Sequence, residues 1–94
     1  MNITGRDKLD HFKKKHPISR IALDRWVQVV SEAKWKFFRD VKETFNSVDK
    51  VGEYLIFNIK GNDFRLSTKV VFQAGLVIII EIMDHKTYDR KKFK

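Results

Sequence analysis

Three side chains in the second half of the chain are of the types that can cleave RNA without a metal. Arg65 lies in the segment FNIKGNDFRL, residues 57–66, and His85 and Tyr88 lie in the segment DHKTYD, residues 84–89. A histidine and a tyrosine can transfer protons, and a guanidinium can hold two phosphate oxygens at once. An RNA 2′-hydroxyl attacks the adjacent phosphate when a base removes its proton, a cation stabilises the developing charge and an acid protonates the leaving oxygen. The three residues therefore suit RNA cleavage by internal attack.

Each of these residues also has an ordinary structural interpretation. An arginine in a strand commonly pairs with an acid on the next strand, and Glu81 is a candidate partner for Arg65. His85 could be an exposed polar residue at a strand end, and Tyr88 could pack its ring over a sheet. The residues alone leave the catalytic and the structural interpretations open.

The composition indicates one small, basic domain spanning residues 1–94. The chain has 43% hydrophobic residues, which suffice for one core, and 34% charged residues with a net charge of +8. Such an excess of cations favours a polyanionic partner, because neutralised phosphates release counterions. RNA or DNA is therefore the leading class of partner, although ribosomal proteins and membrane-surface domains share this charge.

No membrane segment or export signal is expected. The longest apolar run, Leu76–Ile80, ends at Glu81 and is far shorter than the roughly 20 residues of a membrane helix. Residues 1–9 carry charges in place of the apolar run of a signal peptide. We therefore expect a cytoplasmic protein without a membrane partner.

No metal or cofactor site is expected either. The chain lacks cysteine, which excludes disulfides and thiolate metal sites. His11 and His16 lie beside lysines that would repel a metal cation, and no carboxylate cluster joins them. The four glycines, at positions 5, 52, 61 and 75, are too scattered to form a phosphate-binding loop. We predict no metal, no cofactor and no nucleotide-dependent phosphoryl transfer.

The first half of the chain predicts a short strand and helices. Residues 1–4 are a candidate edge strand, and a helix of about ten residues should follow Gly5, because Leu9 and Phe12 form an apolar side and Lys13–Lys15 suit a last turn. The His16-Pro17 pair ends it. Ser19 is a candidate cap of a second helix. Its buried stripe is predicted to consist of Leu23, Trp26, Val27, Val30 and Ala33.

The helical period is predicted to continue beyond the second helix. Trp35, Phe37, Phe38 and Val41 keep helical spacing after a bend near Lys34. Residues 46–52 are expected to form a loop. The spacing of Trp26 and Trp35 indicates core packing rather than base stacking.

The second half predicts a three-stranded antiparallel meander. Residues 54–59 alternate as a strand, and Gly61-Asn62 tolerate the positive φ angles of a hairpin. The next strand places Arg65 and Lys69 on one face. A turn at residues 73–75 leads to a third strand over residues 76–83, apolar on both sides except at Glu81.

The predicted fold class is therefore α/β (α+β). A small antiparallel β-sheet should pack against two N-terminal helices and end in a short basic C-terminal tail or helix. We predict that the helix-covered face consists of Leu55, Phe57, Ile59, Phe64, Leu66, Val70, Ile78, Ile80 and Ile82.

The segments FNIKGNDFRL and DHKTYD resemble the HigB branch of the RelE-like toxins, the messenger-RNA-cleaving halves of bacterial toxin–antitoxin pairs. Weaker similarities cover most of the rest of the chain, at His16-Pro17, Trp26, Ala33-Lys34-Trp35 and residues 45–52. The resemblance implies a RelE-like fold and metal-independent cleavage of messenger RNA, in many cases on the ribosome. It marks Asn62, Arg65, His85, Tyr88 and Asp89.

With the resemblance added, we predict Arg65, His85 and Tyr88 as the catalytic residues. The predicted substrate-binding residues are Lys60, Asn62, Lys69, Lys86, Lys91 and Lys92. The resemblance implies the toxin of a type II toxin–antitoxin system, with messenger RNA and the ribosome as targets. It also implies a HigA-like antitoxin with a helix-turn-helix domain as partner, and operator DNA contacted only through that antitoxin.

Two positions depart from the family pattern. Relatives carry an arginine just before the acid of the last strand, where this chain has Ile80, and a threonine before the histidine, where it has Asp84. The first change removes a phosphate ligand, for which Lys69 or Lys86 is the candidate replacement, and the second adds a negative charge. Two alternatives therefore stay open, a non-catalytic basic RNA-binding or ribosome-associated protein on the same scaffold, and a protein-interaction module.

Overall fold

The computed structural model describes the backbone of residues 1–91 and the side chains of residues 1–88. The elements in chain order are β1 (Asn2–Thr4), α1 (Arg6–Lys15), a 3₁₀ turn (Pro17–Ser19), α2 (Arg20–Glu32), α3 (Phe38–Thr44), β2 (Asp49–Val51), β3 (Tyr54–Ile59), β4 (Phe64–Val71), a second 3₁₀ turn (Phe72–Ala74), β5 (Leu76–Asp84) and α4 (His85–Lys91). The strands form one sheet in the order β1-β5-β4-β3-β2.

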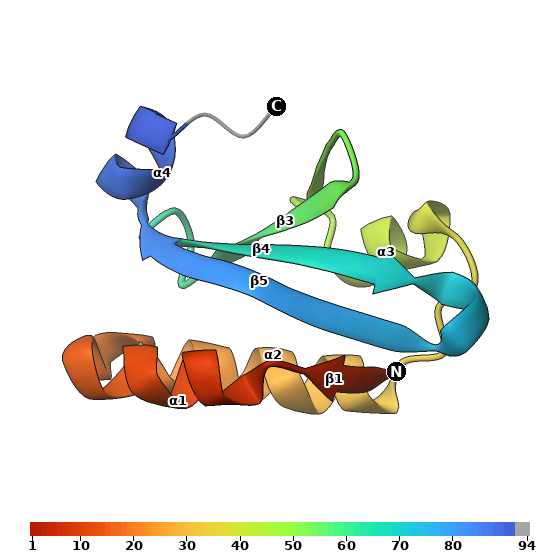
Figure 1. The fold of residues 1–94 in the computed structure, drawn as a ribbon, viewed down its shortest axis with the longest axis horizontal. Coiled ribbons are helices and arrows are strands. Elements are labelled where there is room, and N and C mark those ends of the chain that lie inside the picture. The colour runs from red at the N-terminus through yellow and green to blue at the C-terminus, as the bar shows by residue number, and fades with distance from the viewer. Residues whose placement is uncertain (92–94) are drawn as a thin grey trace.

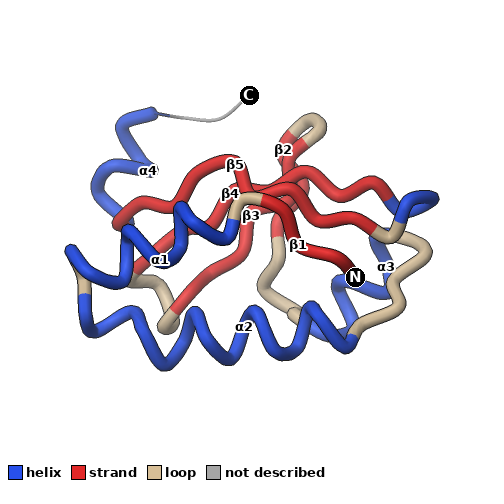
Figure 2. The backbone as a smooth tube through the Cα atoms, turned by 60° about the horizontal axis from the view of Figure 1, so that its bottom comes forward, coloured by secondary structure: helices blue, strands red, loops and turns tan. Residues whose placement is uncertain are grey.

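The helices lie on both sides of this sheet. Figure 1 shows α1 and α2 side by side along one face and α4 rising from the end of β5 on the other side, and Figure 2 shows α1 and α2 covering the strands. The strands pair antiparallel except β1, which runs parallel to β5. The predicted fold class is confirmed, as are the N-terminal edge strand, the first helix and a basic C-terminal helix.

The second helix begins differently from the prediction. The Ser19 hydroxyl makes no capping bond to α2; it donates to the carbonyl oxygen of His16 at 2.7 Å inside the preceding 3₁₀ turn. Ser19 is fully buried there, and this bond gives its hydroxyl a partner within the turn that begins at Pro17. Ser19 therefore stabilises the connection between α1 and α2 rather than the helix start.

The helical stretch predicted through Trp35 and Phe37 is wrong. Ala33 leaves the helix with an extended backbone, and the N-terminal ammonium of Met1 donates to the carbonyl oxygens of Val30 at 3.1 Å and Ala33 at 2.6 Å. These bonds add donors at the carbonyl end of α2, where the Val30 carbonyl also accepts the backbone N–H of Ala33 at 3.1 Å. The chain becomes helical again only at Phe38, where the carboxylate of Asp40 accepts the backbone N–H of Phe37 at 3.1 Å.

The predicted loop over residues 46–52 contains the short edge strand β2. Asp49 pairs with Ile56 and Val51 with Tyr54, and two of the three β2 residues are exposed. In the next hairpin the positive φ angles fall on Lys60, at 53°, and Gly61, at 65°, rather than on Asn62. The hairpin itself is as predicted.

A β-bulge changes which side chains of β5 face the helices. Ser67 pairs with Glu81 whereas Thr68 pairs with Ile79, so Ile80 is an extra residue on β5. Beyond the bulge the buried side chains are Val77 and Ile79, not the predicted Ile78 and Ile80. The other predicted positions of this face pack in or against the core with Leu23, Trp26 and Val30. Trp26 and Trp35 are both buried, as predicted.

Candidate active site

The β3–β4 hairpin loop positions two of the predicted catalytic residues. The carbonyl oxygen of Asn62 accepts a bond from Nη1 of Arg65 at 2.9 Å, and the carbonyl oxygen of Asp63 accepts the backbone N–H of His85 at 3.0 Å. Arg65 pairs with Asn58 on β3 and with Met83 on β5. The loop therefore holds the guanidinium at the end of β4 and joins it to the start of α4.

Arg65 and Tyr88 meet on the sheet face that lies opposite α1 and α2, which we call the Arg65 face and which bears Arg65, Ser67 and Lys69 of β4. The guanidinium carbon lies 5.6 Å from the centroid of the Tyr88 ring. Both side chains are half-buried. They line a cavity of about 310 Å³, the Arg65–Tyr88 pocket, together with Lys42, Ser47, Val48, Asp49, Ile56 and Asn58.

His85 and the predicted lysines lie outside the lining of this pocket. His85 is exposed on the first turn of α4, three residues before Tyr88. Lys60 forms an ion pair with Asp63 at 3.2 Å in the hairpin loop, and Lys86 is exposed on α4. Lys69 shares a face with Arg65 as predicted, but its ammonium is 3.4 Å from Glu53 and lies over the Tyr54 ring. Lys69 is therefore directed toward β3 and not toward Arg65.

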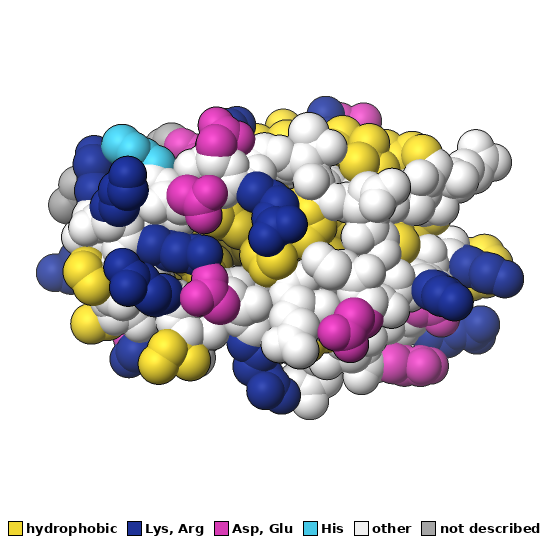
Figure 3. Space-filling view, turned by 90° about the horizontal axis from the view of Figure 1, so that it is seen from below, with side chains coloured by type: hydrophobic (Ala, Val, Ile, Leu, Met, Phe, Trp, Pro, Cys, Tyr) yellow, Lys and Arg dark blue, Asp and Glu magenta, His cyan; other side chains and the backbone are white. Residues whose placement is uncertain are grey.

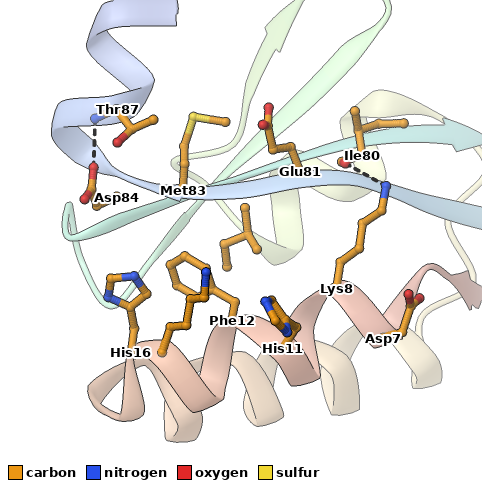
Figure 4. Close-up of a pocket in the computed structure, with 12 residues that line it drawn as sticks. Asp7, Lys8, His11, Phe12, His16, Ile80, Glu81, Met83, Asp84 and Thr87 are labelled. Atoms are coloured by element: carbon orange, nitrogen blue, oxygen red, sulfur yellow. Dashed lines mark hydrogen bonds between the residues drawn. The ribbon is translucent and has the colours of Figure 1, made fainter.

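The resemblance also marks Asp89, and Lys91 and Lys92 are predicted substrate-binding residues. The side chains of Asp89 and Lys91 and the whole of Lys92 lie outside the described residues. The candidate salt-bridge partner Glu81 is opposite Ser67 rather than opposite Arg65. In Figure 4, Ile80, Glu81 and Met83 point away from α1. An arginine in place of Ile80 would therefore project from the same side of β5 as Glu81.

Asp84 does not lie on the Arg65 face. It pairs with Phe64, and it lies with His16 and Phe12 along the groove between β5 and α1 (Figure 4). Its carboxylate accepts the backbone N–H of Thr87 at 2.7 Å and so caps α4. Bonds from the Thr87 backbone and hydroxyl hold the pKa of Asp84 below its usual range. The negative charge that departs from the family pattern therefore serves the helix start.

Sequence reasoning missed Asn58, Lys42 and Asp49 as pocket residues. The alternation of β3 places Asn58 on the same face as Ile56, so the pairing of Asn58 with Arg65 follows from strand register alone. Lys42 donates from Nζ to the carbonyl oxygen of Val48 at 3.1 Å and so fixes the loop before β2. No local pattern in the sequence indicates that this loop closes the pocket.

The part of the chain that the structure describes offers neither a metal site nor a membrane-spanning helix. Within it, no three histidine, aspartate or glutamate residues are grouped as a metal ion would require. Within the same residues, every helix is too short or too polar to cross a membrane.

The chain was compared with known proteins. The family model of the HigB toxin, described as the RelE-like toxic component of a toxin–antitoxin system, matches residues 19–91. The chain is 26% identical over 92 residues to the mRNA interferase toxin HigB of Escherichia coli K12, a match that covers 95% of this chain and 88% of that protein. The same identity and coverage hold for the mRNA interferase HigB of Escherichia coli O157:H7 and of Shigella flexneri. The chain belongs to the HigB toxin family and is the toxic component of a toxin–antitoxin pair.

Proposed function

We propose that this chain is an mRNA interferase, an endoribonuclease that cleaves messenger RNA on the ribosome without a metal and is inhibited by a HigA-like antitoxin. The observation that carries the proposal is the Arg65–Tyr88 pocket, in which a guanidinium and a phenol share one cavity with an amide and an ammonium group. The names of the relatives in Escherichia coli and Shigella flexneri support the same activity.

The proposed reaction is an internal transfer at phosphorus. The 2′-oxygen of the RNA forms a bond to the adjacent phosphorus, the bond to the 5′-oxygen breaks, and the products are a 2′,3′-cyclic phosphate and a free 5′-hydroxyl. One proton leaves the 2′-hydroxyl and one reaches the 5′-oxygen; His85 and Tyr88 are the proposed groups for these transfers. Arg65 holds the phosphate oxygens, on which negative charge builds.

The geometry supports unequal roles for these residues. Arg65 and Tyr88 are already in contact, whereas His85 is exposed at the edge of the site and anchored through its backbone. An RNA strand bound across the Arg65 face would meet His85 from solvent. Lys86, Asn62 and Lys60 surround the same corner of the sheet, and we propose that they hold flanking phosphates.

The test compares cleavage of a translated message on programmed ribosomes with growth arrest after expression without the antitoxin. Arg65→Ala should lower single-turnover cleavage by about 100-fold or more, because it removes the main charge donor. The matched control is Lys14→Ala, which removes one positive charge from an exposed position on α1, across the sheet from Arg65. It should cleave as the native chain does.

Two results would separate the alternatives. A native chain that binds ribosomes but cleaves nothing supports the non-catalytic RNA-binding protein on the same scaffold. Equal loss of cleavage in Arg65→Ala and Lys14→Ala would show that net charge, not the Arg65–Tyr88 pocket, governs the activity. Cleavage that persists in a metal chelator and yields a 2′,3′-cyclic phosphate is expected.

A further inference from the structure

The outer edge of β5 is paired along only a third of its length. β5 has nine residues, and β1 pairs with the first three, Leu76, Val77 and Ile78. Within the described chain no strand pairs with this edge over residues 79–84. An edge of this length leaves backbone donors and acceptors available for another strand.

Gly5 ends the β1 pairing at a defined place. Its φ of +93° turns the chain out of the sheet, and a Cβ at this position would lie 3.1 Å from the carbonyl oxygen of Ile79. The chain then continues as α1, which runs beneath β5 in Figure 1. Gly5 therefore fills this path beside Ile79, and beyond Ile79 no strand of the described chain follows β5.

A groove of about 850 Å³ lies along this edge, between α1 and β5, and we call it the β5 groove. It is larger than the Arg65–Tyr88 pocket, whose volume is about 310 Å³. Figure 4 shows its two walls, with α1 below and β5 above. The α1 wall consists of Asp7, Lys8, His11, Phe12, Lys15 and His16, and β5 contributes Ile80–Asp84.

The backbone of β5 faces into this groove. The carbonyl oxygen of Ile80 accepts a bond from Nζ of Lys8 at 3.0 Å, so it points toward α1 and not toward β4. Lys8 thus bonds to one backbone acceptor of the edge. Lysine side chains commonly protect exposed sheet edges from pairing with other chains in this way.

We infer that the β5 groove binds an extended segment of the antitoxin, which adds a strand to the sheet along Ile80–Asp84. Backbone hydrogen bonds would supply the affinity, and the alternate side chains the specificity. This inference rests on membership of a toxin–antitoxin family and not on the chemistry proposed for Arg65.

The groove also specifies the kind of segment. Phe12 stacks on His16, with ring centroids 4.4 Å apart, and contacts Phe64 edge-on at 5.3 Å, so this part of the wall is aromatic. Lys8 and Lys15 are exposed at two positions of the same wall. The segment that matches this wall has apolar residues that face Phe12. It also has one acidic residue near Lys8 and another near Lys15.

A peptide fits this groove better than a nucleic acid does. Asp7, Glu81 and Asp84 also line it, and their charges would repel a continuous phosphate backbone. A peptide can place single acids beside the lysines and leave uncharged residues beside the carboxylates. Figure 3, which looks onto α1 and α2, shows that the Lys and Arg side chains gather most densely at the end where α1 passes into α2, so an acidic partner is attracted to this side.

Occupation of the groove would bear on the candidate active site. Thr87 lines the far end of the groove, and Thr87 belongs to α4, which also carries His85 and Tyr88. A strand along β5 would therefore end against α4. The antitoxin could in this way inhibit the toxin without covering the Arg65–Tyr88 pocket.

The test uses the protein encoded by the reading frame next to the toxin gene as the probe. The toxin carries Arg65→Ala in every sample, so that its purification does not depend on toxicity and the result does not depend on the proposed nuclease activity. Hydrogen–deuterium exchange is compared for the toxin alone and in the complex. Amides of residues 80–84 should become protected, and those of the opposite edge strand β2 should not.

A pair of variants tests the lysines of the groove. Lys8→Glu combined with Lys15→Glu should weaken the complex by about tenfold or more per reversed charge, because like charges would face each other. The matched control is Lys14→Glu, which reverses an exposed charge on the same helix outside the groove. Circular dichroism checks that each variant is folded.

Three outcomes would overturn the inference. Protection confined to β2 or to the Arg65 face would place the antitoxin elsewhere. Equal affinities of the double variant and the Lys14→Glu variant would exclude a role of the groove. Protection of residues 80–84 in the toxin alone at high concentration, or on addition of RNA, would assign the edge to a second copy of the chain or to nucleic acid.

Discussion

The guanidinium of Arg65 on β4 lies over the ring of Tyr88 on α4, with 5.6 Å between the guanidinium carbon and the ring centroid. A cation placed over an aromatic face in this way is attracted by the ring electrons. The contact joins the sheet to α4, which contains residues 85–89 of the DHKTYD segment. Each of the two residues therefore positions the other as well as facing the Arg65–Tyr88 pocket.

Substitutions of Tyr88 should separate these two roles. Tyr88→Phe keeps the ring beneath Arg65 and removes only the hydroxyl, so stability should stay native while single-turnover cleavage falls about 100-fold or more. Tyr88→Ala also removes the ring, and the free energy of unfolding should fall by a further ~0.5–1 kcal/mol. Denaturant unfolding and cleavage on programmed ribosomes measure the two effects. Native cleavage by Tyr88→Phe would exclude the phenol from proton transfer.

The sheet could be predicted from the sequence because its side chains alternate with a period of two. Register was predicted correctly for β3 and β4, so Arg65 and Lys69 share a face as expected. It was wrong for part of β5, because the run Val77–Glu81 is apolar at four successive positions and any phase fits it. Only the pairing with β4 fixes the bulge at Ile80, and no local pattern encodes that pairing.

The helical half shows the same division between local and distant causes. The buried stripe of α2 was predictable from spacing, whereas no local pattern shows that the Met1 ammonium, about thirty residues away in the chain, bonds to carbonyls at its end. The candidate site divides in this way too. Arg65 and Tyr88 are marked by a motif, but Lys42 and Asp49 reach the pocket only through the loop before β2.

Asp84 should matter for stability rather than for RNA repulsion, since it caps α4 and lies on the face away from Arg65. Asp84→Ala should lower the free energy of unfolding by about 1 kcal/mol, the usual effect of losing a helix cap. Asp84→Asn keeps a capping oxygen and should lower the free energy of unfolding by only a few tenths of a kcal/mol. Denaturant unfolding at pH 7 measures both. A rise in cleavage in either variant would show instead that the Asp84 charge acts on the substrate.

The same residue makes a prediction about pH. The pKa of Asp84 is lowered in the folded chain, because the carboxylate accepts bonds from Thr87. A carboxyl group whose pKa is depressed by folding contributes stability that is complete above its unfolded pKa of about 4 and is lost as the pH falls through the folded value. Unfolding curves between pH 5 and pH 2 should therefore decline less steeply for Asp84→Asn than for the native chain. Parallel curves would contradict this.

Gly5 should be the less replaceable of two glycines with positive φ angles. Alanine costs about 1–2 kcal/mol in a left-handed backbone conformation, and this applies both to Gly5, at +93°, and to Gly75, at +63°. At Gly5 the new Cβ would also lie 3.1 Å from the carbonyl oxygen of Ile79, whereas nothing lies within 4 Å of it at Gly75. Thermal unfolding should thus show a larger decrease for Gly5→Ala than for Gly75→Ala. Equal decreases would mean that β1 and β5 separate easily to admit the methyl group.

The C-terminal lysines should contribute to RNA affinity and not to the chemical step. A chain with a net charge of +8 should lose affinity for ribosomes and RNA steeply as salt rises, because each phosphate contact releases a counterion. Replacing Lys91, Lys92 and Lys94 with alanine should weaken binding and reduce the slope of log affinity against log salt by up to about 2, at roughly 0.7 per contact with single-stranded RNA. Cleavage of RNA already bound should change little. The matched control is the alanine triple variant of Lys13, Lys14 and Lys15, which removes the same charge from α1, where Lys13 already pairs with Asp24. Equal slopes for the tail variant and the native chain would show that the tail takes no part in binding.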